Sequence, residues 1–201
     1  MAGAPGKTDM MDFIQSQKAR IDAALARRFE KQGKWPPKLF EAVRYSLFAG
    51  GKRLRPVLAL TVVELLGRDF TRFENLFLSL ECIHTYSLIH DDLPAMDNAD
   101  LRRGKTTCHK VFGEAQAILA GDALLTLGFE LLARTPTKLP AATVVQIIQT
   151  VARASGPNGM VAGQAIDIGR VPASPTPARL EDLERRKTGA LIQAALIAGA
   201  L

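Results

Sequence analysis

Apolar residues recur at helical spacing along most of this chain, and polar breakers separate the recurring runs. The first run carries Ile21, Ala24 and Leu25 on one face, and the segment 33–38 ("GKWPPK") ends it. Gly50–Gly51 and Gly67 are stop signals for the next two runs. The predicted helices cover 10–29, 39–49, 56–66, 72–92, 111–134, 141–155, 159–169 and 178–201.

Several of these helices are apolar on more than one face, so each is expected to pack on several neighbours. No alternating strand pattern and no internal repeat appears. The pattern predicts an all-α bundle, with a loose tail over 1–9 and one domain over 10–201. Within it we expect a kink at Gly121 and an N-cap at Thr176, before Pro177, after the proline-rich connection.

Composition supports a real core but leaves the partner open. Hydrophobic residues make up 47% of the 201 positions, and the net charge is +6. Such an excess suits nucleic acid, an anionic membrane or a small polyanionic substrate. The start lacks the apolar run of a signal peptide, and the apolar stretch 189–201 is too short to span a bilayer, so no membrane anchor is expected. Cys82 and Cys108 form no paired motif, which suits reduced thiols and a cytoplasmic location.

The segment 90–105 ("HDDLPAMDNADLRRGK") holds the first candidate chemistry. Pro94 disrupts regular helix geometry, so Asp91 and Asp92 should end one helix and the chain should fold back to present Asp97. Three carboxylates that converge at a helix end suit Mg²⁺, which takes its other ligands from water and substrate phosphates. A solvated acidic turn is the alternative for such a pair of aspartates.

Basic residues follow these acids at once. Arg102, Arg103 and Lys105 could simply pair with the aspartates, but exposed ion pairs contribute little. The alternative is a diphosphate held from two sides, by Mg²⁺ on the acids and by guanidinium groups directly.

A second basic cluster lies upstream, in "GGKRLRP". Lys52 and Arg55 follow two glycines at a predicted helix start, where the backbone can approach an anion, although a basic turn is often only solvated. His84 lies about two turns before Asp91 and shares its face, so we place it in the site, although a lone helical histidine is often a core residue. We assign His90 and His109 to structural roles.

Four stretches resemble the trans-isoprenyl diphosphate synthases, most of all the bacterial farnesyl diphosphate synthase type. They are "YSLFAGGKRLRPVL", "ECIHTYSLIHDDLPAMDNADLRRGKTTCHKVFGEAQAILAGDALL", "GMVAGQAIDI" and "RRKTGALIQAA". The similarity runs in order from Met10 to Leu201. It implies an isoprenoid-synthase-type helical bundle around a deep central cavity, usually a homodimer in the cytoplasm.

The resemblance also implies roles for individual residues. Asp91, Asp92 and Asp97 match the aspartate-rich motif that holds Mg²⁺ on the allylic diphosphate, and Ala99 stands where many relatives have another Asp. The catalytic set is then Asp91, Asp92, Asp97, Arg102 and Lys187. Contacts to the allylic diphosphate fall on Arg102, Gln164, Lys187 and Thr188, and contacts to isopentenyl diphosphate on Lys52, Arg55, His84 and Arg103.

The implied reaction is the ionisation of dimethylallyl or geranyl diphosphate, followed by attack of isopentenyl diphosphate on the carbocation. Tyr86, five residues before Asp91, would then block a growing tail and favour the C15 product, farnesyl diphosphate, over C20. The alternative is that Tyr86 only packs in the core.

One departure from the family pattern is large. A second aspartate-rich motif is expected beyond "KTGAL", and the sequence ends at Leu201 without it. We therefore expect a fragment that lacks the last helices of the bundle. A geranylgeranyl diphosphate synthase and an inactive diphosphate-binding subunit are the alternatives. A nucleic-acid-binding protein is disfavoured by the interleaved acids, and a terpene cyclase by the second basic cluster.

Overall fold

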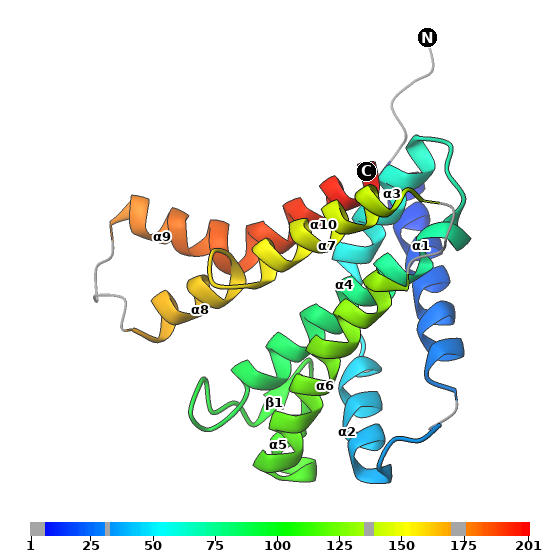
Figure 1. The fold of residues 1–201 in the computed structure, drawn as a ribbon. Coiled ribbons are helices and arrows are strands. Elements are labelled where there is room, and N and C mark those ends of the chain that lie inside the picture. Colours follow the sequence, from blue (N-terminus) through cyan, green and yellow to red (C-terminus); the bar gives the residue numbers. More distant parts are fainter. Residues whose placement is uncertain (1–6, 31–32, 135–138, 170–175) are drawn as a thin grey trace.

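The computed structural model describes residues 7–30, 33–134, 139–169 and 176–201. Its helices and its two short strands follow one another in the order shown in Figure 1. They are α1 (Lys7–Arg28), α2 (Pro37–Leu47), α3 (Leu54–Leu65), α4 (Phe70–Asp91), β1 (Leu101–Arg102), β2 (Lys105–Thr106), α5 (Cys108–Phe112), α6 (Glu114–Ala133), α7 (Ala141–Ser155), α8 (Met160–Ile168), α9 (Pro177–Glu184), the π-helix η1 (Arg185–Gly189) and α10 (Ala190–Ala200).

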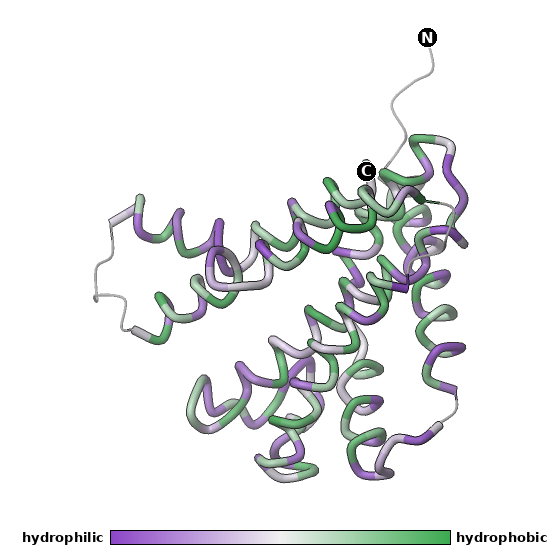
Figure 2. Tube along the Cα trace, in the orientation of Figure 1, coloured by the Kyte–Doolittle hydropathy of each residue, from purple (hydrophilic) through white to green (hydrophobic). Residues whose placement is uncertain are grey.

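The central helix is α4, which is buried on most of its sides. Its largest interface is with α6, and α3 covers another face. Phe73, Phe77 and Leu80 are fully buried along it. Apolar residues lie on several sides of α6 and α10 as well (Figure 2), which is why these helices contact more than one neighbour.

The last part of the chain, from α7 to α10, forms an arm beside the body that is built around α4. Helices α7 and α10 run side by side, and α8 and α9 extend beyond them at the left of Figure 1. Gly163 lets α8 approach η1 closely, because a Cβ at this position would lie 2.3 Å from the backbone nitrogen of Lys187. The arm therefore brings α8 and η1 opposite the C-terminal end of α4.

The all-α prediction is confirmed, with differences at particular residues. Helix α6 continues without a break through Gly121, where we expected a kink. The interruption lies at Gly113, whose φ of 88° ends α5 before α6 begins. The predicted single helix 178–201 is three elements, since a π-turn separates α9 from α10. Two residues of β1 pair with two of β2, and sequences this short carry no alternation to predict.

The helix boundaries also differ at the N-terminus. We expected a tail over 1–9, yet α1 begins at Lys7, because polar residues continue a helix without an apolar signal. The N-cap at Thr176 is confirmed, since its hydroxyl accepts a hydrogen bond from the backbone N–H of Arg179. Most of the proline-rich connection falls on 170–175, outside the described residues.

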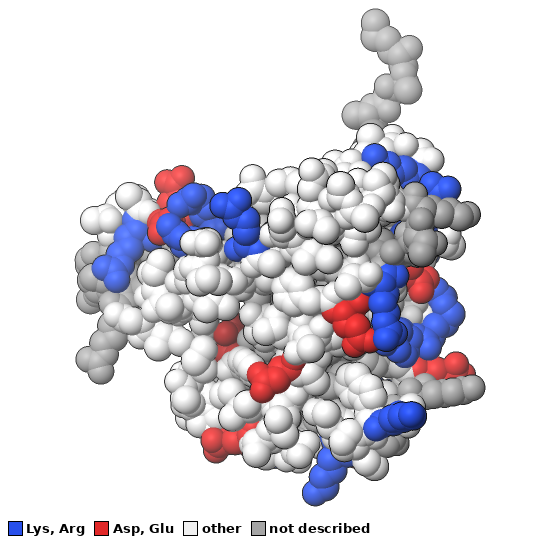
Figure 3. Space-filling model, viewed as in Figure 1, with Lys and Arg blue, Asp and Glu red and all other residues white. Residues whose placement is uncertain are grey.

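Two surface features bear on the partner classes. By length and composition alone, α6 is apolar enough to cross a membrane, but the same holds for core helices of bundles, and 44% of its most apolar window is buried against other helices. On the face shown in Figure 3, Lys and Arg gather around α9 and on the α1 side, with further basic side chains at the lower edge and acidic side chains among them. The positive charge on this face is therefore spread over several separate places.

Candidate active site between the arm and the body

The C-terminal end of α4 is folded back as the sequence predicts. The backbone N–H of Asp97 donates to the carbonyl of Asp91 at 2.8 Å, and that of Asn98 donates to Leu93 at 3.0 Å. Asn98 adopts a left-handed conformation (φ 48°), which asparagine tolerates. This turn returns Asp97 to the end of the helix that carries Asp91.

The expected convergence of three aspartates is only partly correct. Asp92 is buried, and its Oδ1 accepts a hydrogen bond from Arg102 Nε at 2.8 Å, so its carboxylate is already neutralised. Exposed ion pairs contribute little, but the pair of Asp92 and Arg102 is a strong one because Asp92 is buried. Within the described part of the chain, no group of three or more His, Cys, Asp or Glu side chains is placed to hold a metal ion.

Asp91 and Asp97 remain as carboxylates without an ion pair among the described residues. Burial raises the pKa of Asp91 to about 6, Lys187 opposes this shift, and Asp97 adds to it. The position at a helix C-terminus is also unfavourable for a carboxylate. Such a pair suits Mg²⁺, which needs only one or two carboxylates when phosphates supply other ligands.

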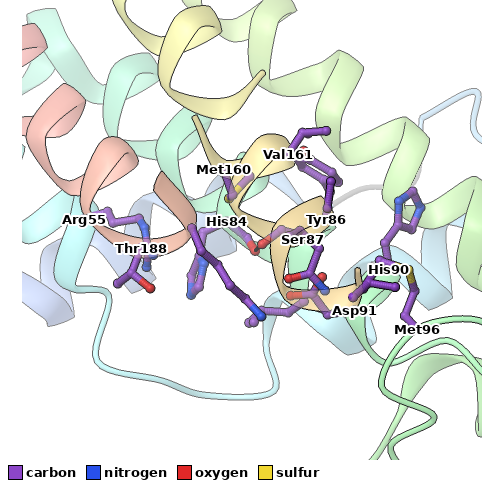
Figure 4. Close-up of a pocket in the computed structure, with 15 residues that line it drawn as sticks. Arg55, His84, Tyr86, Ser87, His90, Asp91, Met96, Met160, Val161 and Thr188 are labelled. Atoms are coloured by element: carbon purple, nitrogen blue, oxygen red, sulfur yellow. Dashed lines mark hydrogen bonds between the residues drawn. The ribbon is translucent and has the colours of Figure 1, made fainter. Parts of the chain in front are cut away.

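A cavity of about 420 Å³ lies between α4, α8 and η1, and Asp91 faces into it (Figure 4). Arg55, His84 and Thr188 lie at one end of the view, and His90 and Met96 at the other. The sequence-predicted residues that line this cavity are Arg55, His84, Tyr86, Asp91, Gln164, Lys187 and Thr188. The shared face predicted for His84 and Asp91 is confirmed.

A second cavity of similar size adjoins the first, and most of its lining residues are basic. Arg55 and His84 line both cavities and so form the wall between them. The second cavity is completed by Gly51, Lys52, Arg53, Leu54 and Arg103. Burial and, to a smaller extent, the nearby arginines lower the pKa of His84 to about 3, so the imidazole is neutral at physiological pH.

Arg102 and Arg103 are separated although they are adjacent. Arg102 turns to Asp92, whereas Arg103 donates to the carbonyl of Gly50 and lies over Gly51. The φ of 123° at Gly51 favours glycine, and a Cβ there would also push the Arg103 guanidinium out of its place. The β1–β2 hairpin thereby touches the "GGKRLRP" segment, a contact that the sequence did not indicate.

The arm contributes Gln164 and Lys187. Lys187 forms an ion pair with Asp167 at 2.5 Å, one turn after Gln164 on α8. Both side-chain polar atoms of Gln164 are buried without a hydrogen-bond partner among the described residues, which leaves them for a ligand. The π-turn of η1 carries Lys187 and Thr188 into the cavity.

His90 lies at the apolar end of the cavity, where the sequence analysis did not place it. The Tyr86 ring meets the His90 ring edge to face at 5.7 Å, and His90 Nε2 lies 3.1 Å from the carbonyl of Ile118 on α6. A Cβ at Gly121 would lie 2.1 Å from His90 Nε2, so this glycine makes room for the imidazole. His90 is one helical turn after Tyr86, and this spacing could have found it. Outside the cavities, His109 is buried beside Thr107, as a structural histidine would be.

Comparison with known proteins agrees with this geometry. The polyprenyl synthetase family model matches residues 36–201. The chain is 50% identical over 190 residues to a farnesyl diphosphate synthase of Geobacillus stearothermophilus, covering 94% of this chain and 64% of that protein. It is 50% identical over 199 residues to geranylgeranyl pyrophosphate synthase 3 of Arabidopsis thaliana, covering 97% of this chain and 54% of that protein.

Solved structures give the same result. A geranyltransferase of Legionella pneumophila superposes with a TM-score of 0.91 at 41% identity, covering 96% of this chain and 69% of that chain. An FPP/GFPP synthase of Zymomonas mobilis gives a TM-score of 0.87 at 41% identity, covering 96% of this chain and 70% of that one. The chain thus spans little more than half to two thirds of the curated relatives' length, and it belongs to the polyprenyl synthetase family.

Proposed function

We propose that this chain carries the substrate sites of a Mg²⁺-dependent prenyltransferase, which condenses isopentenyl diphosphate with dimethylallyl or geranyl diphosphate to give farnesyl diphosphate. One observation supports this most directly: two adjoining cavities share the wall formed by Arg55 and His84. One contains a carboxylate and an apolar end, and the other contains four cationic side chains and no carboxylate among its lining residues. Two diphosphates with different tails fit such a pair.

We assign the allylic diphosphate to the cavity that holds Asp91, Gln164, Lys187 and Thr188. Asp91 and Asp97 are the proposed metal ligands. Asp92 holds Arg102 by their hydrogen bond, and it is free to bind metal only if the substrate draws Arg102 away. When bound there, Mg²⁺ supplies positive charge that stabilises the leaving diphosphate. Lys187 and Arg102 add cationic hydrogen-bond donors to the same group.

We assign isopentenyl diphosphate to the cavity of Lys52, Arg55 and Arg103. The allylic C–O bond breaks with its electron pair on the diphosphate, and the isopentenyl double bond then forms the new C–C bond. A proton is lost from the isopentenyl carbon next to the new cation and passes to the released diphosphate. Apolar residues of α4 and α8 exclude water from the cation meanwhile.

The test is a product assay on this chain with Mg²⁺, geranyl diphosphate and isopentenyl diphosphate, read by mass spectrometry. A C15 diphosphate that disappears in the Asp91→Asn variant supports the proposal. A C20 product would support the geranylgeranyl alternative, which the names of the Arabidopsis relatives favour. Binding of both substrates without any product would indicate a diphosphate-binding subunit.

We further propose a homodimer in the cytoplasm, without nucleic-acid partners. On α6, Ile118 and Leu119 are exposed apolar side chains, and a groove beside them is lined by Trp35, Leu39 and Leu127. Paired copies would remove this apolar surface from water. Light scattering after gel filtration should give twice the 21.8 kDa chain mass, and a monomeric mass would refute the dimer.

A further inference from the structure

The buried ion pair between Arg53 and Glu81 lies directly behind the cationic cavity, and the proposed chemistry does not use it. Arg53 and Glu81 have side chains that are 3% and 2% exposed, and Arg53 Nη1 lies 2.6 Å from Glu81 Oε1. The other carboxylate oxygen, Oε2, has no hydrogen-bond partner in the part of the chain that the structure describes. Buried ion pairs of this kind contribute little net stability, so a role beyond stability is worth seeking.

The Arg53 guanidinium connects three helices at one point. Besides Glu81 on α4, its Nε donates to Asp22 Oδ1 on α1 at 2.8 Å, and its Nη2 donates to the carbonyl of Leu47 on α2 at 2.7 Å. All three nitrogens are therefore engaged with protein. These bonds use three of the five N–H groups of the guanidinium and hold it against the protein, whereas Arg55 Nε is buried without a hydrogen-bond partner among the described residues.

The backbone of Arg53 is held in an unusual conformation. Its φ of 50° and ψ of 34° lie in the left-handed region, which is unfavourable for a residue with a Cβ. The same residue caps α3, since its carbonyl accepts the N–H of Val57 at 3.0 Å. The three side-chain contacts hold this conformation and so fix the directions in which Lys52 and Arg55 leave the chain.

Glu81 also balances charge within the cluster. Burial lowers the pKa of Arg55 and of Arg103, and the Glu81 carboxylate counteracts this for both. Arg103 in turn lies over Gly51 in the same loop. Without Glu81, the four cations around the cavity would lose the carboxylate that counteracts their burial, and Asp22 would be left as the acidic partner of Arg53.

We propose that Arg53 and Glu81 are positioning residues for the cationic cavity: the buried pair fixes the Gly50–Arg55 loop so that Lys52, Arg55 and Arg103 converge on one diphosphate. This inference deepens the proposed function, because it rests on a diphosphate in that cavity. It concerns preorganisation, because Glu81 does not line the cavity and the Arg53 guanidinium is held by three hydrogen bonds to the protein.

Calorimetric titration without Mg²⁺ tests the proposal, with isopentenyl diphosphate and inorganic pyrophosphate as separate probes. In the Glu81→Gln variant we expect the dissociation constant for both probes to rise by about tenfold to a hundredfold, because misplaced ligands lose affinity steeply. The matched control is Glu74→Gln on the same helix, whose partner Arg27 is exposed, and it should change affinity less than twofold. Unchanged or tighter binding by Glu81→Gln would mean that the carboxylate only subtracts charge, and would overturn the proposal.

A second variant covers the case in which Glu81→Gln does not fold. Arg53→Met combined with Glu81→Leu replaces the ion pair with apolar side chains, a change that often preserves folding. If the pair served stability alone, the folded double variant would bind isopentenyl diphosphate like the parent, which would refute positioning. A parent chain that binds pyrophosphate but not isopentenyl diphosphate would refute the proposed substrate and leave positioning to be judged on pyrophosphate. A parent that binds neither would overturn both.

Discussion

His84 carries a pH dependence that belongs to a single residue. Its pKa falls from the ordinary 6.5 to about 3 through burial and the surrounding arginines. Below about pH 6.5 the His84 imidazole takes up a proton in the unfolded chain, whereas in the folded protein it stays neutral down to about pH 3. The free energy of unfolding is therefore highest above about pH 6.5 and falls as the pH drops below that value. Between about pH 7.5 and about pH 5, the free energy of unfolding should therefore fall by on the order of 2 kcal/mol through His84.

The His84→Asn variant should lose this part of the acid sensitivity. Urea unfolding of both proteins at the two pH values measures it, as the difference between the pH-dependent losses. An equal loss in parent and variant would mean that His84 is protonated in the folded protein. His90, on the same helix, provides the comparison: His90→Asn should keep the pH dependence due to His84.

Tyr86 governs tail length if it blocks the cavity rather than only filling the core. The ring is 7% exposed and is braced by His90. In Tyr86→Ala we expect affinity for a C20 prenyl thiolodiphosphate to rise about tenfold relative to the C15 analogue, as opened apolar space accepts more methylenes. Competition binding with Mg²⁺ measures the ratio. Tyr86→Phe keeps the ring and should behave like the parent, and an unchanged ratio in Tyr86→Ala would assign the ring to core packing.

At the scale of elements, the contact between α8 and η1 places Lys187 and Thr188. A Cβ at Gly163 would lie 2.3 Å from Lys187 N and 2.6 Å from its Cα, so backbone would have to move. Gly163→Ala should lower the free energy of unfolding by about 1–3 kcal/mol through overpacking and weaken binding of a geranyl thiolodiphosphate. Thermal unfolding and titration measure the two effects.

The matched control is Gly189→Ala in the same π-turn. A Cβ there would have its nearest contact, the carbonyl of Glu184, at 3.6 Å, an ordinary distance. Alanine also favours helix over glycine, so this variant should be at least as stable as the parent. Equal behaviour of the two variants would show that the close approach of α8 and η1 is unimportant.

The sequence could predict most elements, but not how pairs of them meet. The helices 72–92 and 141–155 followed from apolar periodicity and flanking breakers, and α4 and α7 lie there within about two residues. The sequence predicted one helix over 111–134 with a kink at Gly121, whereas the break lies at Gly113. Periodicity cannot tell a glycine that ends a helix from one that makes room for a neighbour's side chain. Only the packing of α6 on α4 shows that Gly121 accommodates His90.

At the scale of the whole molecule, the sequence predicted the members of the candidate site better than the contacts between them. Spacing placed His84 and Asp91 on one face, and the resemblance added Gln164, Lys187 and Thr188 from the distant arm, which the cavity unites with them. The sequence offered pairing of Arg102 with an aspartate as an alternative but could not decide for it, because the pairing depends on how the β1–β2 hairpin returns Arg102 to Asp92. Long-range contacts between loops leave no periodic trace in the sequence.

The two cavities should differ in their need for metal, which is a property of the whole molecule. The first contains Asp91, which repels a diphosphate unless a cation intervenes, whereas the second has no acidic side chain among its lining residues. A ligand at a hundred times its dissociation constant stabilises the fold by about 2.7 kcal/mol. With Mg²⁺ we therefore expect geranyl thiolodiphosphate and isopentenyl diphosphate each to raise the melting temperature.

Removing Mg²⁺ with a chelator should abolish the shift caused by geranyl thiolodiphosphate and leave most of the shift caused by isopentenyl diphosphate, because the second cavity supplies its own cations. Scanning calorimetry at constant ionic strength measures both shifts and keeps screening equal. Lys52→Ala provides the converse control, since it should weaken the isopentenyl response and spare the geranyl one. If the chelator removed both shifts, or neither, the two cavities would not be the chemically distinct sites that their lining residues indicate, and the assignment of the two substrates would have to be abandoned.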